Sequence, residues 1–133
     1  MSAVFVDTSA LYALLSATDP EHARAAKTFA GLAQERVPLA TSSYVLVEVY
    51  ALLSRRLGLK AVKAFRHDFA PVLRTSWVDA EVHEQALDLL EQEARRKLSL
   101  VDATSFVLMR RLGIDRAFAF DEDFKRAGFE MVG

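Results

Sequence analysis

Four carboxylates stand at positions from which their side chains can meet at one point of the folded chain. They are Asp7, Glu48, Asp102 and Asp121. Asp7 directly follows the apolar run 3–6, Asp121 follows the run 117–120, and Asp102 opens a predicted helix after 98–101. Ligands of parallel sheets bind beyond the carboxyl ends of the strands, where these acids are expected. Clustered carboxylates need cations to stay ionised, and oxygen ligands suit Mg²⁺ or Mn²⁺. The set therefore predicts a divalent-metal site able to hydrolyse a phosphodiester.

Glu48 is the acid whose position is hardest to explain by structure alone. In a predicted helix over 44–56 it lies three residues after Val45 and four before Leu52, on the apolar side. Burying an unpaired carboxylate costs several kcal/mol, and no Lys or Arg lies within one turn of Glu48. The alternative is a glutamate at the edge of the stripe that reaches solvent or pairs with a distant arginine. For the three aspartates the alternative is helix N-capping, which Asp favours.

Strands and helices alternate along the chain, which predicts an α/β fold with a parallel sheet covered on both faces. Strands are expected at 3–6, 38–41, 72–78, 117–120 and 130–132. Helices are expected at 8–16, 20–35, 44–56, 60–69, 102–112 and 121–127, and from the cap Asp79 to an inward-facing Ala94. No repeat or linker divides the sequence, so residues 1–133 are expected to form a single domain.

Composition narrows the classes of function. Cysteine is absent, which excludes disulfides, zinc–thiolate sites and thiol catalysis, and the histidines His22, His67 and His83 lack metal-ligand spacing. The formal net charge of −1 argues against broad coating of nucleic acid but allows an enzyme with a small footprint. No run approaches the roughly 20 apolar residues of a membrane span, and no signal peptide is evident, so a cytoplasmic protein without a membrane partner is expected.

The motifs, taken in order, resemble a known family. The segments are 4–11 with Asp7, 41–48 with Glu48, 98–106 with Asp102, and 117–124 with Asp121, followed by Gly128-Phe129. Their order and spacing resemble the PIN-domain ribonucleases, and among them the VapC toxins of bacterial toxin–antitoxin pairs. No single segment is specific, but the ordered set covers essentially the whole chain.

The resemblance implies a three-layer α/β/α sandwich with a parallel sheet of about five strands and Mg²⁺- or Mn²⁺-dependent cleavage of RNA. It carries the catalytic and metal-binding roles onto the four acids. The supporting candidates are Thr8, Ser9, Ser105 and Asp123. Ala119 departs from the family, which often has Thr two residues before the last acid, so Asp123 is an alternative to Asp121 as the fourth acid. A cognate antitoxin and a homodimer, formed through the helices of 19–35 and 44–69, are further implications of the resemblance.

Other functions and site residues stay open at this stage. A PIN ribonuclease of RNA processing and a catalytically silent PIN-like binding module are alternatives, whereas an Asp-x-Asp phosphatase is disfavoured because Ser9 follows Asp7 at the second position. Trp77 is expected in the core. Two basic clusters are candidates for phosphate contacts: Arg55, Arg56, Lys60 and Lys63, and then Arg110, Arg111 and Arg116.

Overall fold

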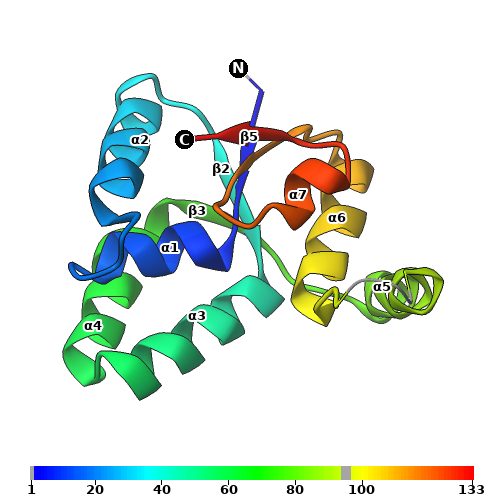
Figure 1. Ribbon diagram of the computed structural model, residues 1–133, viewed down its shortest axis with the longest axis horizontal. Coiled ribbons are helices and arrows are strands. Elements are labelled where there is room, and N and C mark those ends of the chain that lie inside the picture. The colour runs from blue at the N-terminus through cyan, green and yellow to red at the C-terminus, as the bar shows by residue number, and fades with distance from the viewer. Residues whose placement is uncertain (1, 94–96) are drawn as a thin grey trace.

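The computed structural model describes residues 2–93 and 97–133, and within them five parallel strands form one sheet in the order β3-β2-β1-β4-β5 (Figure 1). The strands are β1 (Val4–Val6), β2 (Leu39–Ser42), β3 (Leu73–Ser76), β4 (Arg116–Phe118) and β5 (Glu130–Val132). The predicted five-stranded parallel sheet flanked by helices is confirmed.

Helices cover both faces of this sheet. They are α1 (Thr8–Leu15), α2 (His22–Gln34), α3 (Ser43–Arg56), α4 (Leu59–Ala64), α5 (Ala80–Gln92), α6 (Leu100–Leu112) and α7 (Asp123–Arg126). The chain steps from β1 outward to β3, then crosses back to β4 and β5. Right-handed crossovers in the two directions place α1–α4 on one face and α5–α7 on the other. In Figure 1 the strands lie between α2 and α4 on one side and α5 and α6 on the other.

The centre of the core is β1, whose three residues are completely buried. Strand β1 pairs with β2 through Val4 and Leu39, and with β4 through Phe5 and Ala117. A strand buried on both faces reads as a continuous apolar run, which is why 3–6 was recognisable in the sequence. The chain leaves β1 toward β2 and β3 and later returns to β4 on the other side of β1, so the topological switch point lies between the carboxyl ends of β1 and β4.

Several predicted boundaries are wrong because local hydrogen bonding overrides the apolar pattern. Strand β4 ends at Phe118, so Ala119 and Phe120 lie between it and Asp121. Helix α6 begins at Leu100 and not at Asp102, because the Ser99 hydroxyl caps it. Other helices and strands also differ from the predicted ranges. Helix α2 begins at His22, α7 is limited to Asp123–Arg126, and the predicted helix 60–69 divides into α4 and a π-helical turn (Phe65–Phe69). Strands β2 and β3 cover Leu39–Ser42 and Leu73–Ser76.

Trp77 is not a core residue, since 78% of its surface is exposed. It follows β3, an edge strand in which Leu73 is the buried position. An edge strand has a neighbour on one side alone, so the turn after it offers little to pack against. The expected inward position of Ala94 lies outside the described residues. Within the described ranges no helix combines the length and the apolar character needed to cross a membrane.

Candidate active site

Three aspartates from separate elements converge at the switch point of the sheet. Asp7 follows β1, Asp102 lies in the first turn of α6, and Asp121 lies between β4 and α7. One carboxylate oxygen from each lies within 4.8 Å of the others. The structure thus brings together three of the four acids predicted from the sequence, at the edge where they were expected.

Asp7 is held by its own helix and by the loop after β4. It is the N-cap of α1, where its Oδ2 accepts hydrogen bonds from the Ser9 amide at 3.3 Å and the Ser9 hydroxyl at 2.9 Å. The same hydroxyl accepts from the Phe120 amide at 2.9 Å. Asp7 is 3% exposed, and its Oδ1 is buried without a hydrogen-bond partner among the described residues. Burial raises the pKa of Asp7 to about 6, although the hydrogen bonds from Ser9 lower it.

Asp102 occupies the third position of α6, and its amide donates to the Ser99 hydroxyl at 3.0 Å. This bond satisfies one of the free amides of the first helical turn and fixes the start of the helix. Burial raises the pKa of Asp102 to about 9, and the negative charges of Asp7, Asp121 and Glu48 act in the same direction. A carboxyl with this pKa keeps its proton at neutral pH unless a cation is bound beside it.

Asp121 and Asp123 point to different partners. Asp121 Oδ1 accepts a hydrogen bond from the Asp123 amide at 2.9 Å, and its carboxylate belongs to the cluster. The Asp123 carboxylate instead forms an ion pair with Arg126 at 3.1 Å, one turn along α7. The geometry therefore favours Asp121 over Asp123 as the fourth acid.

Glu48 lies on α3 at the border of the buried face. Val45, Val49 and Leu53 fill the core side of the helix, whereas Glu48 is half-buried. Its side chain lines the same hollow as the aspartates, and its charge contributes to the raised pKa of Asp102. Glu48 therefore lies at the edge of the apolar stripe and is not a fully buried carboxylate, and it lines the hollow together with the other acids.

The acids line a hollow of about 500 Å³, which we call the acidic hollow. Its carboxylates are Asp7, Asp19, Glu21, Glu48, Asp102 and Asp121. Its remaining lining residues are Thr8, Ser9, Tyr12, Leu52, Arg56, Ser99 and Phe120. A larger cavity of about 740 Å³ adjoins it and shares Glu21 and Phe120, but the aspartate cluster does not line that cavity. We therefore place the chemistry in the smaller hollow.

The donor set of the acidic hollow fits a hard divalent cation. Its candidate ligands are carboxylate oxygens, which Mg²⁺ and Mn²⁺ prefer. The unpartnered Oδ1 of Asp7 is a buried acceptor that a cation would satisfy. The raised pKa values of Asp7 and Asp102 agree with this, because both carboxyls are raised first by burial, and the negative charge of Asp7 raises the pKa of Asp102 further.

The supporting candidates separate into two groups. Ser9 ties Asp7 to the loop after β4, and Thr8 lines the acidic hollow with a buried hydroxyl that has no hydrogen-bond partner in the described part of the chain. The Ser105 hydroxyl instead donates to the Val101 carbonyl at 2.9 Å, within α6. Thr8 and Ser9 thus belong to the site, and Ser105 makes a contact of the helix backbone.

Sequence reasoning missed several residues of the hollow. Ser99 was detectable, because a serine three residues before an acid is a capping signal. Tyr12 lies one turn after Thr8 on α1, so helical spacing could have placed it on the same face. Asp19 and Glu21 belong to the turns that lead into α2, and only the three-dimensional fold brings them to the acids.

The second basic cluster is engaged in contacts away from the acidic hollow. Arg110 donates to a backbone carbonyl of the loop after α7, Arg111 forms a 3.7 Å ion pair with Glu81, and Arg116 donates to the Ser2 carbonyl. From the first cluster, Arg56 lines the hollow. The structure thus distinguishes among cations that the sequence left equivalent.

Comparison with known proteins agrees with the geometry of the site. The PIN domain family matches residues 4–130. The chain belongs to the PIN domain family. This PIN domain is 43% identical over 131 residues to the 23S rRNA-specific endonuclease VapC20 of Mycobacterium tuberculosis, in strains CDC 1551 / Oshkosh and ATCC 25618 / H37Rv, with 97% of each chain covered. The family resemblance predicted from the motifs is confirmed.

Solved structures show the same relationship. The crystal structure of Mycobacterium tuberculosis VapC20, described as a sarcin–ricin loop cleaving toxin, superposes on this PIN domain with a TM-score of 0.84, at 42% identity and 96% coverage of each chain. FitAcB from Neisseria gonorrhoeae gives a TM-score of 0.71 over 100% of this chain and 97% of that one. Because the sequences of these two chains are 15% identical, the similarity to FitAcB is evidence for the fold alone.

Proposed function

We propose that this PIN domain is a VapC-type endoribonuclease that cuts ribosomal RNA with the help of a divalent cation. The observation that carries the proposal is the convergence of three aspartates within 4.8 Å, with one buried oxygen of Asp7 lacking a partner among the described residues. The relative at 43% identity is named as specific for 23S rRNA, which makes this RNA the first substrate to test.

The proposed ligands of the cation are Asp7, Asp102 and Asp121, with Glu48 completing the set from α3. Mg²⁺ is the first candidate and Mn²⁺ the second, because both prefer oxygen ligands. When bound, such a cation supplies positive charge that polarises water and offsets the charge of the phosphodiester. Asp102 would lose its proton on binding such a cation, so binding would be coupled to proton release.

The side chains of the hollow have positioning roles in this proposal. The Ser9 hydroxyl joins Asp7 to the loop that carries Asp121, and so keeps two of the acids in register. Hydrolysis joins a water oxygen to phosphorus and breaks the bond to one ribose oxygen, which leaves with a proton. Thr8 offers a buried hydroxyl beside Asp7 that is available to a ligand in the hollow.

The biological setting follows from the family as a further part of the proposal. We expect a toxin inhibited by a cognate antitoxin, acting in the cytoplasm as a homodimer, with residues 1–133 forming one catalytic domain. Leu57, between α3 and α4, is 37% exposed, and Leu59, the first residue of α4, is 66% exposed. Both lie in the region assigned to the dimer contact and support it. Sedimentation of wild type and Leu59→Glu tests the dimer, because a charge at the contact should yield monomers.

Cleavage of a 23S rRNA fragment tests the enzymatic proposal. We expect cutting at a defined position with Mg²⁺ or Mn²⁺, loss of cutting with chelator, and loss of cutting in Asp102→Asn. Cutting that persists in chelator, or a folded Asp102→Asn variant of undiminished activity, would refute the mechanism. Expression in a host then distinguishes the alternatives. A toxin cuts the RNA and arrests growth, an RNA-processing enzyme cuts RNA without arresting growth, and a silent module neither cuts RNA nor arrests growth.

A further inference from the structure

Arg56 stands out in the acidic hollow because it brings a positive charge to a surface lined by six carboxylates. An RNA strand that enters the hollow meets like charge on most sides. Among the described residues that line it, Arg56 is the cation. A residue in this position has a strong influence on how a polyanion is held.

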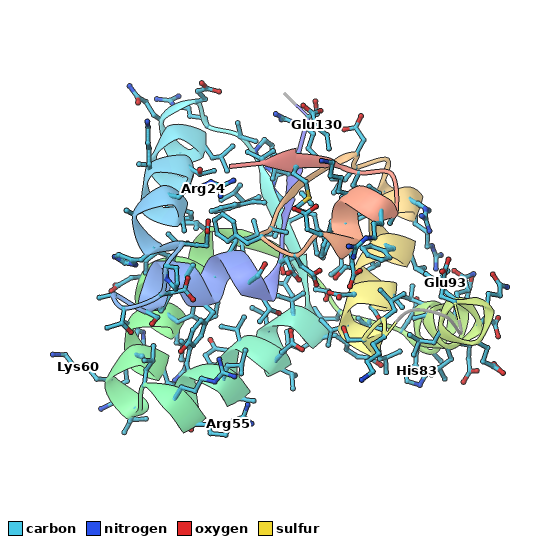
Figure 2. All side chains as sticks on the ribbon, in the orientation of Figure 1. Arg24, Arg55, Lys60, His83, Glu93 and Glu130 are labelled. Carbon is cyan, nitrogen blue, oxygen red and sulfur yellow. The ribbon has the colours of Figure 1, made fainter. Side chains whose placement is uncertain are left out.

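The donors of Arg56 are unused within the described part of the chain. Its guanidinium lies over the Tyr12 ring, with Cζ 5.4 Å from the ring centroid, and neither an ion pair nor a hydrogen bond joins it to a described residue. Stacking on an aromatic face restrains the guanidinium plane and leaves its five N–H groups available. Arg24, in the adjoining cavity, is different: it donates to the Gly133 carbonyl and to Glu21, as it reaches from α2 toward β5 (Figure 2).

Helix α3 sets the separation between Arg56 and the acids. Glu48, Leu52 and Arg56 follow one another at intervals of four residues, and all three line the hollow. Eight residues of α-helix span about 12 Å along the axis. Arg56 therefore lies two helical turns beyond Glu48 on the same side of α3, with Leu52 between them.

We propose that Arg56 positions the RNA substrate by binding a backbone phosphate that flanks the cleaved one. A guanidinium presents paired N–H groups that match two phosphate oxygens, and an arginine held by Tyr12 is partly preorganised for this contact. The inference rests on the proposed function, and it adds to that function a residue that acts on binding. It assigns the role to one member of the basic cluster of 55–63.

The neighbouring arginine provides a matched control. Arg55 carries the same charge on the same helix, but successive helical residues do not share a face. Figure 2 shows Arg55 on the side of α3 that faces away from α1, whereas Arg56 contacts Tyr12 of α1. Arg55→Ala and Arg56→Ala thus make the same change in net charge, and differ in whether the charge is removed from the hollow.

The test measures cleavage kinetics and RNA affinity over a salt series. For Arg56→Ala we expect KM and Kd to rise roughly tenfold, as for loss of one charge-assisted contact, while kcat changes much less. The slope of log affinity against log salt should fall by about 0.7, the value for one phosphate on a single strand. Arg56→Lys should keep the slope and recover part of the affinity, and Arg55→Ala should behave like wild type.

Modified substrates locate the phosphate. A neutral methylphosphonate replaces each flanking phosphate in turn. At one position it should weaken RNA binding by wild type and leave RNA binding by Arg56→Ala unchanged. Equal salt slopes in Arg55→Ala and Arg56→Ala, or the absence of any such position, would overturn the inference. A wild-type protein that binds the RNA without cutting it refutes the proposed function, and the affinity and salt data still decide the role of Arg56.

Discussion

Replacing Asp102 with Asn should stabilise the metal-free protein at neutral and alkaline pH while it abolishes activity. The reason is the raised pKa of Asp102, about 9 in the folded protein against 3.8 for the ordinary side chain, caused first by burial and then by the charge of Asp7. Between these values the unfolded chain has lost this proton and the folded chain retains it. Unfolding is therefore increasingly favoured as pH rises from about 4 to about 9, because the unfolded state binds fewer protons.

The magnitude follows from linkage. One proton held by the folded state alone changes the free energy of unfolding by about 1.4 kcal/mol per pH unit. From pH 5 to pH 8 the carboxyl of Asp102 therefore lowers the stability of metal-free wild type by on the order of 4 kcal/mol. An asparagine has the same shape and does not titrate in this range, so the variant lacks this loss. The other titrating groups are shared, and most of their contribution cancels in the difference.

Chemical denaturation of both proteins in chelator, at several pH values, measures this difference. We expect similar stability near pH 5 and a variant more stable by a few kcal/mol at pH 8. Adding Mg²⁺ or Mn²⁺ should then stabilise wild type, by about 2.7 kcal/mol at a concentration one hundred times its Kd, and stabilise the variant much less. Parallel pH profiles for the two proteins would refute the argument that burial and the charge of Asp7 keep the proton on Asp102 in the folded protein.

Three further predictions concern the neighbours of this cluster. Ser9→Ala should lower the free energy of unfolding by about 1 kcal/mol and lower kcat, because it removes the link between Asp7 and the Phe120 amide. Denaturation measures the first effect and single-turnover cleavage the second, and an unchanged kcat would count against the positioning role of Ser9. Asp123→Asn should leave the affinity for the metal unchanged, whereas Asp121→Asn should weaken it at least tenfold, as measured by titration calorimetry. A larger loss of affinity in Asp123→Asn than in Asp121→Asn would exchange their roles. Phe118→Ala should cost about 3–5 kcal/mol in denaturation, because the ring is fully buried, and a loss below 1 kcal/mol would contradict the packing.

The order of the elements and the edge of the sheet that carries the acids could be predicted because they depend on strong local patterns. The buried strand β1 reads as an apolar run that ends at Asp7, and Asp7 caps the helix that follows it. Gly113 adopts the left-handed conformation and ends α6 as expected of a C-terminal glycine. In these segments local preference and tertiary packing agree, so either one alone leads to the same element.

What the sequence did not predict depends on contacts between distant segments. Trp77 was predicted to lie in the core because it falls within the strand pattern 72–78, but its environment is set by the edge position of β3. Arg55 and Arg56 are equivalent in the sequence, and only the packing of α1 against α3 places one of them over Tyr12. Asp121 and Asp123 differ in the same way, because Asp121 reaches Asp7 and Asp102 from other segments, whereas Asp123 pairs with Arg126 of its own helix.

The near-neutral net charge is compatible with RNA cleavage once the distribution of charge is considered. The acids are concentrated in one hollow, where burial and mutual repulsion raise the pKa of Asp102 well above its ordinary value. Such a surface binds a polyanion poorly until cations offset the carboxylates, so binding of the cation and binding of RNA should be cooperative. Reciprocity then requires RNA to tighten metal binding by the same factor. The acids that make the chain unpromising as a nucleic-acid binder would thereby make the proposed activity dependent on the metal, and Arg56 supplies a fixed positive charge in the hollow.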